Sequence, residues 1–489
     1  MPAHLRRLVV VGGGIAGVCC AEELCKLCAD DPVLLVSASS TIKGVDNIVK
    51  HTKTVEEFEI VERDLNTLPY SNLQVLQAAA VGIDVEKHNL ILEDGTKIAY
   101  DSLCIAAGAV PKAPLVSTAH VLMLRDSGSI QELSHRLRSA KRVMIVGNGG
   151  IALELAQSLQ GYEIIWVMRH SHIGDAFFDR DAAEYLLGQL RGPETASRSI
   201  LPTEGSWRSR APDRAARHYA SEQQLSSWCC RTDGEEQHAK APSGLPTCAG
   251  LGHVTLEHDC EVTSIKEGLS PADSLQEGHP RVQVLLSNGH RHAADLVVFA
   301  TGVVPNTGWL PPELERGPAD GGVAVDASMQ SSVPGIYAAG DCCWVRPEAR
   351  GPQWFQMRLW TQARAQGLYV AKCMSGTADP LELGLPFELF THVTRFCGQK
   401  VVLLGLYNGQ RLGSEPPGDI VTYARTLAGK AGNSFARVLL LRGRLQGAVL
   451  LGETELEETF ENLILDGIDL SRYGPEFMDP DIDLQEVFD

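Results

Sequence analysis

A glycine-rich turn near the start of the chain is the first pattern whose residue types and spacing suggest chemistry. Gly12-x-Gly14-x-x-Gly17 follows the apolar segment Leu8–Val11, and a helix is predicted from the turn to about Cys28. In such a strand–turn–helix unit the first glycine permits a tight turn, the second lets the backbone approach a pyrophosphate, and the third lets helix and strand pack closely. Because a helix N-terminus attracts phosphate through its free N–H groups and its dipole, this turn predicts a dinucleotide site.

The same pattern returns in the second quarter of the chain. Gly147-x-Gly149-x-x-Ala152 follows the predicted strand Val143–Val146, and Glu154 stands just behind it. Two such units predict two dinucleotide-binding folds. We expect Gly147, Gly149 and Glu154 beside the second nucleotide.

The residues that end the next strand in each unit bear on which nucleotide is bound. A carboxylate commonly holds the adenosine ribose there. Here Ser37 follows the strand Val33–Val36, and Arg169 stands near the end of the corresponding strand of the second unit. Ser37 can hydrogen-bond a ribose hydroxyl, less strongly than a carboxylate. Arg169 can pair with a 2′-phosphate, which favours NADPH and leaves NADH open.

Four cysteines, Cys19, Cys20, Cys25 and Cys28, lie within the predicted first helix. Cys25 and Cys28 are neighbours on one helix face, as the thiols of a redox dithiol would be. A redox-active pair, however, begins at a helix N-terminus, where the dipole lowers the thiol pKa, and these stand at the opposite end. We interpret the four as small packing residues; a working dithiol, a metal site and regulatory oxidation are the alternatives.

Length and composition indicate a multidomain globular protein. The chain has 489 residues, 44% hydrophobic and 21% charged, which is too long for one core and predicts two or three domains. No apolar run approaches the roughly 20 residues that span a bilayer, and no signal peptide is expected. We therefore expect an intracellular protein without membrane association, whose 13 cysteines are mostly reduced.

The formal net charge of −18 is concentrated at the end of the chain. Residues 453–489 contain 13 acidic residues and a single Arg. This argues against direct nucleic-acid binding through that segment, because phosphates would be repelled. The segment is either a solubilising acidic tail or a docking surface for a basic partner.

The predicted elements divide the chain into four parts. Residues 1–124 and 297–383 form one Rossmann-like fold, and 125–296 form a second fold inserted into it. Residues 192–250 are polar and show no sustained period, which indicates a flexible insertion in the second fold. The last part, 384–489, is predicted to be a small α+β domain.

Within that last part, residues 437–452 predict two strands joined by a turn near Gly443. A helix with one apolar face follows, carrying Leu456, Phe460, Leu463 and Ile464. The fold class is therefore α/β, with two dinucleotide-binding folds and an α+β domain.

Three further segments make the order of motifs specific. Ala106-Ala107-Gly108 precedes the second glycine turn, Ala300-Thr301-Gly302 follows it, and Gly340-Asp341 comes later. Together with the two turns, this order resembles the pyridine nucleotide-disulfide oxidoreductase family of flavoproteins over roughly residues 5–380. The resemblance implies that the first fold binds FAD and that the inserted fold binds NAD(P)H.

The resemblance also implies roles for single residues. Gly340 and Asp341 would hold the flavin, and the Asp341 carboxylate would accept hydrogen bonds from its ribityl chain. Gly108 and Gly302 end the segments that join the two folds and are expected beside the cofactors. The first of these segments reads Ala-Ala-Gly where the family has Ala-Thr-Gly.

The redox-active cysteines of the family's disulfide reductases are missing from both of their usual places. Residues 37–58 and 140–192 contain no cysteine. Cys229 and Cys230 fall in the predicted insertion, and Cys342 and Cys343 follow Asp341, but adjacent cysteines form only strained rings.

Other residues are expected near the flavin. Ile42 and Lys43 stand at about the position of the missing dithiol and are predicted to face the flavin ring. An aromatic-polar helix is predicted soon after Asp341, serving either domain packing or the flavin edge; it carries Trp354, Gln356, Arg358, Trp360 and Gln362. His392 has no evident partner and is interpreted as a core or surface histidine.

The sequence thus predicts an FAD-dependent enzyme that oxidises NAD(P)H without a redox-active dithiol. Its electron acceptor would be O₂, a quinone or dye, an iron protein, or nothing that reacts fast. The alternatives are a thiol reductase, acting on a partner's cysteines or through Cys342 and Cys343, and an NAD(P)H-binding scaffold with a structural flavin. A closer resemblance to animal members of the family implies a role in nucleus and cytoplasm, protecting a tRNA ligase complex from oxidative inactivation. No metal site is predicted.

Overall fold

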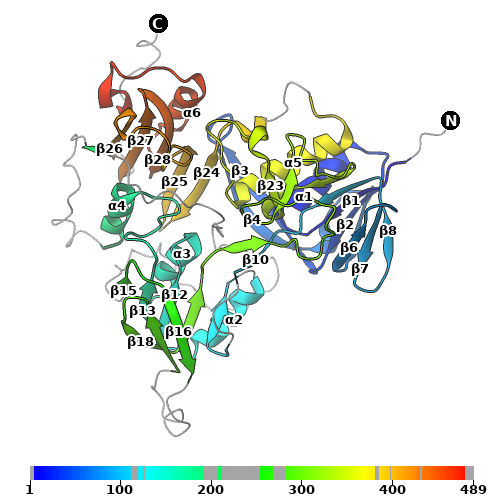
Figure 1. Cartoon of the computed structure of the whole chain (residues 1–489), viewed down its shortest axis with the longest axis horizontal. Coiled ribbons are helices and arrows are strands. Elements are labelled where there is room, and N and C mark those ends of the chain that lie inside the picture. Colours follow the sequence, from blue (N-terminus) through cyan, green and yellow to red (C-terminus); the bar gives the residue numbers. More distant parts are fainter. Residues whose placement is uncertain are drawn as a thin grey trace.

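The structure is a computed structural model that describes residues 5–112, 118–124, 127–191, 208–210, 254–267, 281–379, 385–396, 398–429 and 432–479. Figure 1 shows three groups of elements, which gather around β1 and α1, around β12 and α3, and around β27 and α6. Across these ranges, no helix is both long enough and apolar enough to cross a membrane.

The first group is built on a five-stranded parallel sheet in the order β22-β9-β1-β2-β5. Its central strands are almost wholly buried, as expected for a parallel sheet covered on both faces. Strand β22 follows the strands of the second group in the sequence. The second group is therefore inserted into the first between β9 and β22. The strands are β1 (Leu8–Val11), β2 (Val33–Ser37), β5 (Leu73–Gln77), β9 (Ser102–Ile105) and β22 (Ile336–Ala338).

Two helices, α1 (Ile15–Leu27) and α5 (Trp360–Ser375), pack against each other in this group. Gly367 permits their close approach, because a Cβ there would lie only 2.4 Å from the Ala16 carbonyl oxygen. Smaller sheets complete the unit; they are formed by β3 (Thr41–Lys50) with β4 (Glu56–Asp64), by β6 (Ala80–Asp84), β7 (Asn89–Leu92) and β8 (Lys97–Ala99), and by β21 (Val323–Val325) with β23 (Cys343–Val345).

The second group repeats the parallel arrangement in the order β11-β19-β12-β13-β15. A meander of β16, β17 and β18 packs on it, and β10 pairs with β20 where the chain passes between the two groups. The elements are β10 (Ala109–Pro111), β11 (Val121–Met123), α2 (Ser127–Leu137), β12 (Arg142–Val146), α3 (Gly150–Ser158), β13 (Glu163–Val167), β15 (Val254–Glu257), β16 (Val262–Glu267), β17 (Val282–Leu286), β18 (Arg291–Ala294), β19 (Leu296–Phe299) and β20 (Val303–Pro305). Helix α4 (Arg180–Arg191) follows β13 in the described chain but packs against the third group.

The third group is an antiparallel sheet in the order β14-β26-β27-β28-β25-β24, covered by α6. The predicted hairpin and the apolar face of the following helix are confirmed, since Leu456, Phe460, Leu463 and Ile464 are all buried. The elements are β14 (Arg208–Arg210), β24 (Thr391–Phe396), β25 (Gln399–Gly405), β26 (Ile420–Gly429), β27 (Gly432–Leu441), β28 (Arg444–Leu451) and α6 (Glu457–Asp466).

The predicted α/β class with two dinucleotide-binding folds is confirmed by these two parallel sheets. The proposed boundaries 1–124, 125–296, 297–383 and 384–489 stay predictions. Short 3-10 helices occur at Leu65–Thr67, Gly340–Cys342, Pro347–Ala349, Leu385–Phe387, Pro417–Asp419 and Gly474–Met478.

The helix predicted across 354–362 was wrong in its first half, because α5 begins only at Trp360. The preceding segment is extended and held by its own side chains. The Gln356 amide accepts from the Val345 N–H at 2.9 Å and donates to the Cys343 carbonyl at 2.8 Å. Arg358 donates to the Asp341 carbonyl at 2.9 Å. These distant partners outweigh local helix propensity.

Most of the predicted insertion 192–250 lies outside the described residues. Its residues Arg208–Arg210 form β14, which pairs antiparallel with β26 at the edge of the third sheet. This pairing disfavours a wholly flexible insertion at these three residues, and the flexibility predicted for the insertion as a whole stays a prediction. An open sheet edge offers unpaired N–H and C=O groups, which a strand from elsewhere in the chain can satisfy.

Part of the acidic end of the chain is also structural. Glu457 on α6 pairs with the buried Lys400 at 2.9 Å. Glu461, 1% exposed, accepts from the backbone N–H of Thr54 at 3.0 Å and from its hydroxyl at 2.5 Å. These carboxylates hold α6 in place and are not available to a basic partner.

Candidate functional site

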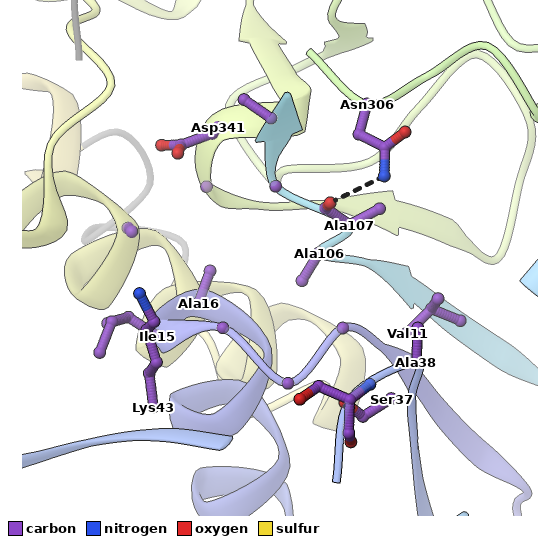
Figure 2. A pocket seen from close by; sticks show the side chains of 18 of the residues that line it. Val11, Ile15, Ala16, Ser37, Ala38, Lys43, Ala106, Ala107, Asn306 and Asp341 are labelled. Carbon is purple, nitrogen blue, oxygen red and sulfur yellow. Dashed lines mark hydrogen bonds between the residues drawn. The ribbon is translucent and has the colours of Figure 1, made fainter. Parts of the chain in front are cut away.

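A cavity of about 810 Å³ opens at the carboxyl ends of the first parallel sheet. Ligands of open α/β sheets bind at this edge, and the volume falls in the range of small-molecule sites. Segments that follow all five strands of the sheet line it, namely those after β1, β2, β5, β9 and β22. Figure 2 shows Asp341 and Lys43 on the chain segments around this space.

The first glycine turn has the geometry that a pyrophosphate requires. Gly12 has a φ of +124°, and a Cβ there would lie 2.1 Å from the Ala106 carbonyl oxygen. At Gly17 a Cβ would lie 2.0 Å from the Gly12 carbonyl oxygen. Gly14 faces open space in the cavity and is the N-cap of α1, so no side chain of the cap residue accepts a hydrogen bond from the first N–H groups of the helix. The turn therefore fits a phosphate group.

Ser37 lines the cavity, but its hydroxyl is engaged within its own turn. The hydroxyl donates to the Ser39 carbonyl at 3.0 Å and accepts from the Ser39 N–H at 3.2 Å. The side chain is 3% exposed. The predicted contact from Ser37 to a ribose stays a prediction, and it would compete with this local pairing.

Asp341 supplies negative charge at the cavity wall. Burial raises the pKa of its carboxyl to about 6, and the nearby positive charges of Arg358 and Lys43 partly oppose that shift. Gln366 on α5 fixes the preceding residue, because its amide oxygen accepts from the Gly340 N–H at 2.8 Å. Arg358 is itself buried and pairs with Asp320.

Of the two residues predicted to face the flavin, only Lys43 reaches the cavity. Its Nζ lies 5.4 Å from the ring centroid of Trp360, which also lines the cavity. Ile42 is fully buried and packs below Gly13, where its Cγ2 would be 3.1 Å from an added Cβ. Successive residues of β3 point to opposite faces, so Ile42 does not line the cavity, and its predicted place beside the flavin ring stays a prediction that this burial disfavours.

Among the described residues, the lining of the cavity contains no cysteine. Burial raises the pKa of Cys25 to about 11, of Cys19 to about 12 and of Cys342 to about 12. The pKa of Cys28 is raised for the same reason. These thiols stay protonated at neutral pH, and the thiolate is the reactive form.

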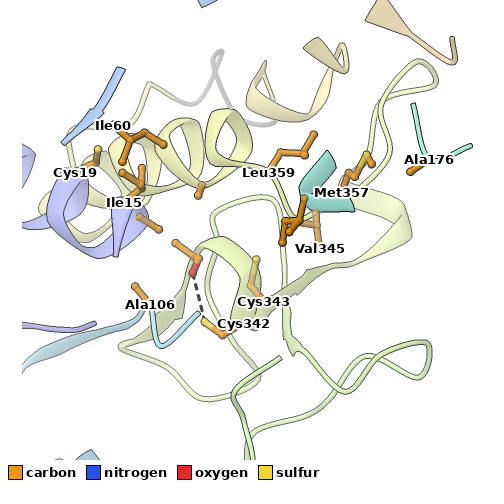
Figure 3. Close-up of a cluster of buried hydrophobic side chains, with 14 of the residues drawn as sticks. Ile15, Cys19, Ile60, Ala106, Ala176, Cys342, Cys343, Val345, Met357 and Leu359 are labelled. Atoms are coloured by element: carbon orange, nitrogen blue, oxygen red, sulfur yellow. Dashed lines mark hydrogen bonds between the residues drawn. The ribbon is translucent and has the colours of Figure 1, made fainter. Parts of the chain in front are cut away.

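Cys342 and Cys343 belong to the core beside the cavity (Figure 3). The Cys342 thiol donates to the carbonyl oxygens of Ile105 at 3.2 Å and Ala339 at 3.3 Å. Burial likewise raises the pKa of Cys343. The predicted role of the described cysteines as packing residues fits this environment; Cys229 and Cys230 lie outside the described residues.

Other predicted residues serve packing. Trp354 is 2% exposed and stacks edge-on against Phe387, away from the cavity lining. Gln362 bonds the backbone of the preceding segment at Met357 and Phe355. His392 does have a partner, since its Nδ1 lies 3.0 Å from the Thr361 hydroxyl, and burial lowers its pKa to about 3.

The second glycine turn repeats the geometry of the first. Gly147 has a φ of +136°, and a Cβ there would lie 2.2 Å from the Ala300 carbonyl oxygen. Gly149 is the N-cap of α3, and it has no side chain that could bond the first N–H groups of the helix. Ile151, on the first turn of α3, lines the cavity. The cavity therefore extends from the first turn to the start of α3, although Gly147 and Gly149 themselves are not among its lining residues.

The remaining predicted residues of the second fold lie at varied distances from that turn. Glu154 is partly buried on α3, one turn beyond Ile151. Arg169 is exposed and forms an ion pair with Glu261. Gly108 lines the cavity with a φ of +66°, and Gly302 has a φ of +85° between β19 and β20.

Sequence reasoning missed several residues of this region. Gln366 orients Gly340 from 26 positions away, which no local motif signals. Asn306 lines the cavity and donates to the Ala107 carbonyl at 3.3 Å, so it ties the two connecting segments together. Its place four residues after the end of the Ala-Thr-Gly segment could have drawn attention to it.

Comparison with known proteins agrees with this geometry. The sequence pattern of the pyridine nucleotide-disulphide oxidoreductase family matches this chain over residues 6–193 and 254–367. The chain belongs to this family. The family's cofactors are FAD and NAD(P)H, and the cavity and the two glycine turns fit them.

Whole-chain similarity extends to individual proteins. Pyridine nucleotide-disulfide oxidoreductase domain-containing protein 1 of Mus musculus is 39% identical, over 100% of this chain and 99% of its own length. An NAD-dependent persulfide reductase from A. fulgidus has a similar fold, with a TM-score of 0.65 at 18% identity over 95% of this chain and 78% of that one. Putidaredoxin reductase in its covalent complex with putidaredoxin has a TM-score of 0.64 at 17% identity, over 99% and 98%.

Replacing Asp341 by asparagine should weaken FAD binding and raise the free energy of unfolding of the FAD-free protein. In the FAD-free protein the raised pKa means that the folded state holds more protons than the unfolded state between about pH 4 and 6, so stability falls as pH rises through that window. FAD-free Asp341→Asn should then be more stable than wild type above pH 6, by at most about 3 kcal/mol, and equal to it near pH 4. Chemical denaturation at several pH values measures this.

The same variant should retain FAD less well, because charge-assisted hydrogen bonds worth roughly 1.5–3 kcal/mol are lost. Asp94→Asn is the control, since hydrogen bonds from Thr96 lower the pKa of that exposed carboxylate. It should give no gain above pH 6. A destabilised Asp341→Asn protein that keeps its FAD would contradict the assignment.

Proposed function

We propose that this protein is an FAD-dependent NAD(P)H oxidoreductase that works without a redox-active dithiol. The observation that carries the proposal is one cavity that runs from the first glycine turn to Ile151 on α3, contains Asp341 and Lys43, and has no cysteine in its described lining. When bound, FAD supplies the ability to accept a hydride from NAD(P)H and to pass electrons onward.

The residues of the chain bind and orient the two cofactors in this proposal. The N-terminus of α1 and the backbone at Gly14 bind the FAD pyrophosphate, and Asp341 accepts hydrogen bonds from the ribityl hydroxyls. Lys43 keeps a positive charge near Trp360 in the same cavity. Ile151 and its apolar neighbours exclude water between the two nucleotides.

The electron acceptor is proposed to be an external molecule, with O₂, a quinone or an iron protein as the classes considered. A disulfide relay through Cys342 and Cys343 is disfavoured because both thiols are buried and their pKa values are raised by that burial. We further propose NADPH as the preferred hydride donor. No carboxylate stands directly after β13, and the exposed Arg169 can exchange its ion pair with Glu261 for one with the 2′-phosphate.

Anaerobic addition of NADPH should bleach the flavin absorbance of the purified yellow protein, and NADH should do so only at higher concentration. Arg169→Ala should reduce that difference because the 2′-phosphate loses its cation. Arg442→Ala is the matched control, an exposed arginine paired with Glu415 and Asp419 away from the cavity. Rapid-mixing absorbance measurements give the rates.

Two outcomes of this experiment would contradict the proposal. If neither nucleotide bleaches the flavin, the flavin is structural and the protein is a binding scaffold. If NADPH instead supports rapid reduction of a small disulfide that is lost in Cys342→Ser, the protein is a thiol reductase.

We also propose that the protein acts in nucleus and cytoplasm and protects a metal-dependent tRNA ligase complex from oxidative inactivation. This proposal rests on the whole-chain resemblance to animal members of the family. It is compatible with a flavoprotein that holds bound nicotinamide and reduced flavin without an internal dithiol. The net charge of −18 disfavours direct contact with tRNA and leaves the ligase proteins as the partner.

The protective role predicts a result with purified components. In air with NADPH, the ligase complex should keep its activity longer with wild-type protein than with a flavin-depleted Asp341→Ala variant. The remaining ligation activity over time measures this. Equal loss with both proteins would overturn the protective role and leave the NAD(P)H oxidase chemistry untouched.

A further inference from the structure

Three metal-ligating side chains meet at the outer edge of the second group, outside the cavity. Glu257 is the last residue of β15, and His290 and His292 belong to the hairpin that joins β17 to β18. Figure 1 shows β15 and β18 in the same group of elements. The strands come from different sheets, a parallel one and the antiparallel meander. The sequence predicted no metal site, because 33 residues separate Glu257 from the nearer histidine.

The ligand atoms converge closely. His290 Nδ1 lies 3.0 Å from Glu257 Oε2, and His292 Nε2 lies 2.8 Å from Glu257 Oε1. All of the ligand atoms lie within 4.8 Å of one another. Around a tetrahedral Zn²⁺ at its usual bond lengths, ligand atoms are about 3.3 Å apart, so only small movements would seat an ion.

The set of ligands has a recognisable chemistry. Two imidazoles and one carboxylate form a known ligand set for Zn²⁺ that leaves a fourth position for water. Burial differs among the three side chains, with 11% of Glu257, 20% of His292 and 63% of His290 exposed. An ion can therefore reach the site from solvent, while two of its ligands are held in place by the fold.

The surroundings orient these ligands. The Asn288 side chain donates to Glu257 Oε2 at 3.0 Å, which supports the carboxylate as outer hydrogen bonds support many metal ligands. The Glu257 carbonyl accepts from the Met168 N–H at 2.9 Å, which anchors β15 beside β13. An imidazole binds a metal through either ring nitrogen while the other nitrogen carries the proton, so the nitrogens that face Glu257 can serve as ligands.

We propose that Glu257, His290 and His292 form a binding site for a borderline divalent cation, with Zn²⁺ as the preferred occupant. The ion would cross-link the edge of the parallel sheet to the meander and so stabilise the nucleotide-binding fold. The site is independent of flavin reduction, because none of its ligands lines the cavity. Without an ion the same three residues form a hydrogen-bonded cluster, and this is the alternative that the experiment must separate.

Co²⁺ titration of the whole untagged protein, stripped of metal with a chelator, tests the site. One equivalent of Co²⁺ should bind with the intense visible absorption of a low-coordinate site, and Zn²⁺ should displace it. Glu257→Gln and His292→Gln should each weaken Co²⁺ binding at least roughly tenfold. Zn²⁺ should also raise the melting temperature of wild type and not that of either variant.

His51→Gln is the matched control, because His51 forms a single pair with Glu57 at 3.0 Å without a second histidine. It should bind Co²⁺ as wild type does. If a β-strand variant fails to fold, His290→Gln replaces it, since that side chain is largely exposed. Absence of a one-equivalent Co²⁺ spectrum, or variants that bind as tightly as wild type, would overturn the metal site.

Discussion

Backbone-to-backbone contact at the two glycine turns is the constraint on which the site depends. At Gly12 and at Gly147 an added Cβ would lie within 2.2 Å of a carbonyl oxygen, that of Ala106 or Ala300. Only glycine allows such contact at a positive φ. Each contact sets a helix N-terminus over the carboxyl edge of its sheet. The place of a phosphate, and hence of a whole dinucleotide, follows from it.

The fold places the charged side chain of Asp341 in the cavity wall and the neighbouring cysteine thiols in the core. Asp341 leaves β22 toward the cavity, and the next two residues, Cys342 and Cys343, are wholly buried in the core. The cysteines of α1 are buried along a helix whose N-terminus alone meets the cavity. Burial keeps these thiols protonated, so an internal dithiol relay is disfavoured and electrons are expected to leave to an external acceptor.

The features that could be predicted from the sequence are those that depend on local residue patterns. The glycine turns, their strands and the apolar face of α6 follow from spacing within a few residues, and the structure agrees with each of them. The paired side chains could not be predicted in this way. Gln356 and Arg358 abolish a plausible helix by bonding distant backbone, and Ile42 and Lys43 separate because β3 alternates its faces. His392 with Thr361, and Glu257 with its two histidines, depend on tertiary contacts alone.

The electron capacity of the protein tests the central claim most directly. An anaerobic titration with dithionite counts the electrons taken up per bound FAD, with flavin absorbance as the readout. A flavin without a redox-active dithiol should take up about two electrons, and pretreatment of the reduced protein with a thiol-alkylating reagent should not change that number. A disulfide is a further two-electron couple. An uptake of about four electrons per FAD, falling to about two after alkylation, would contradict the account.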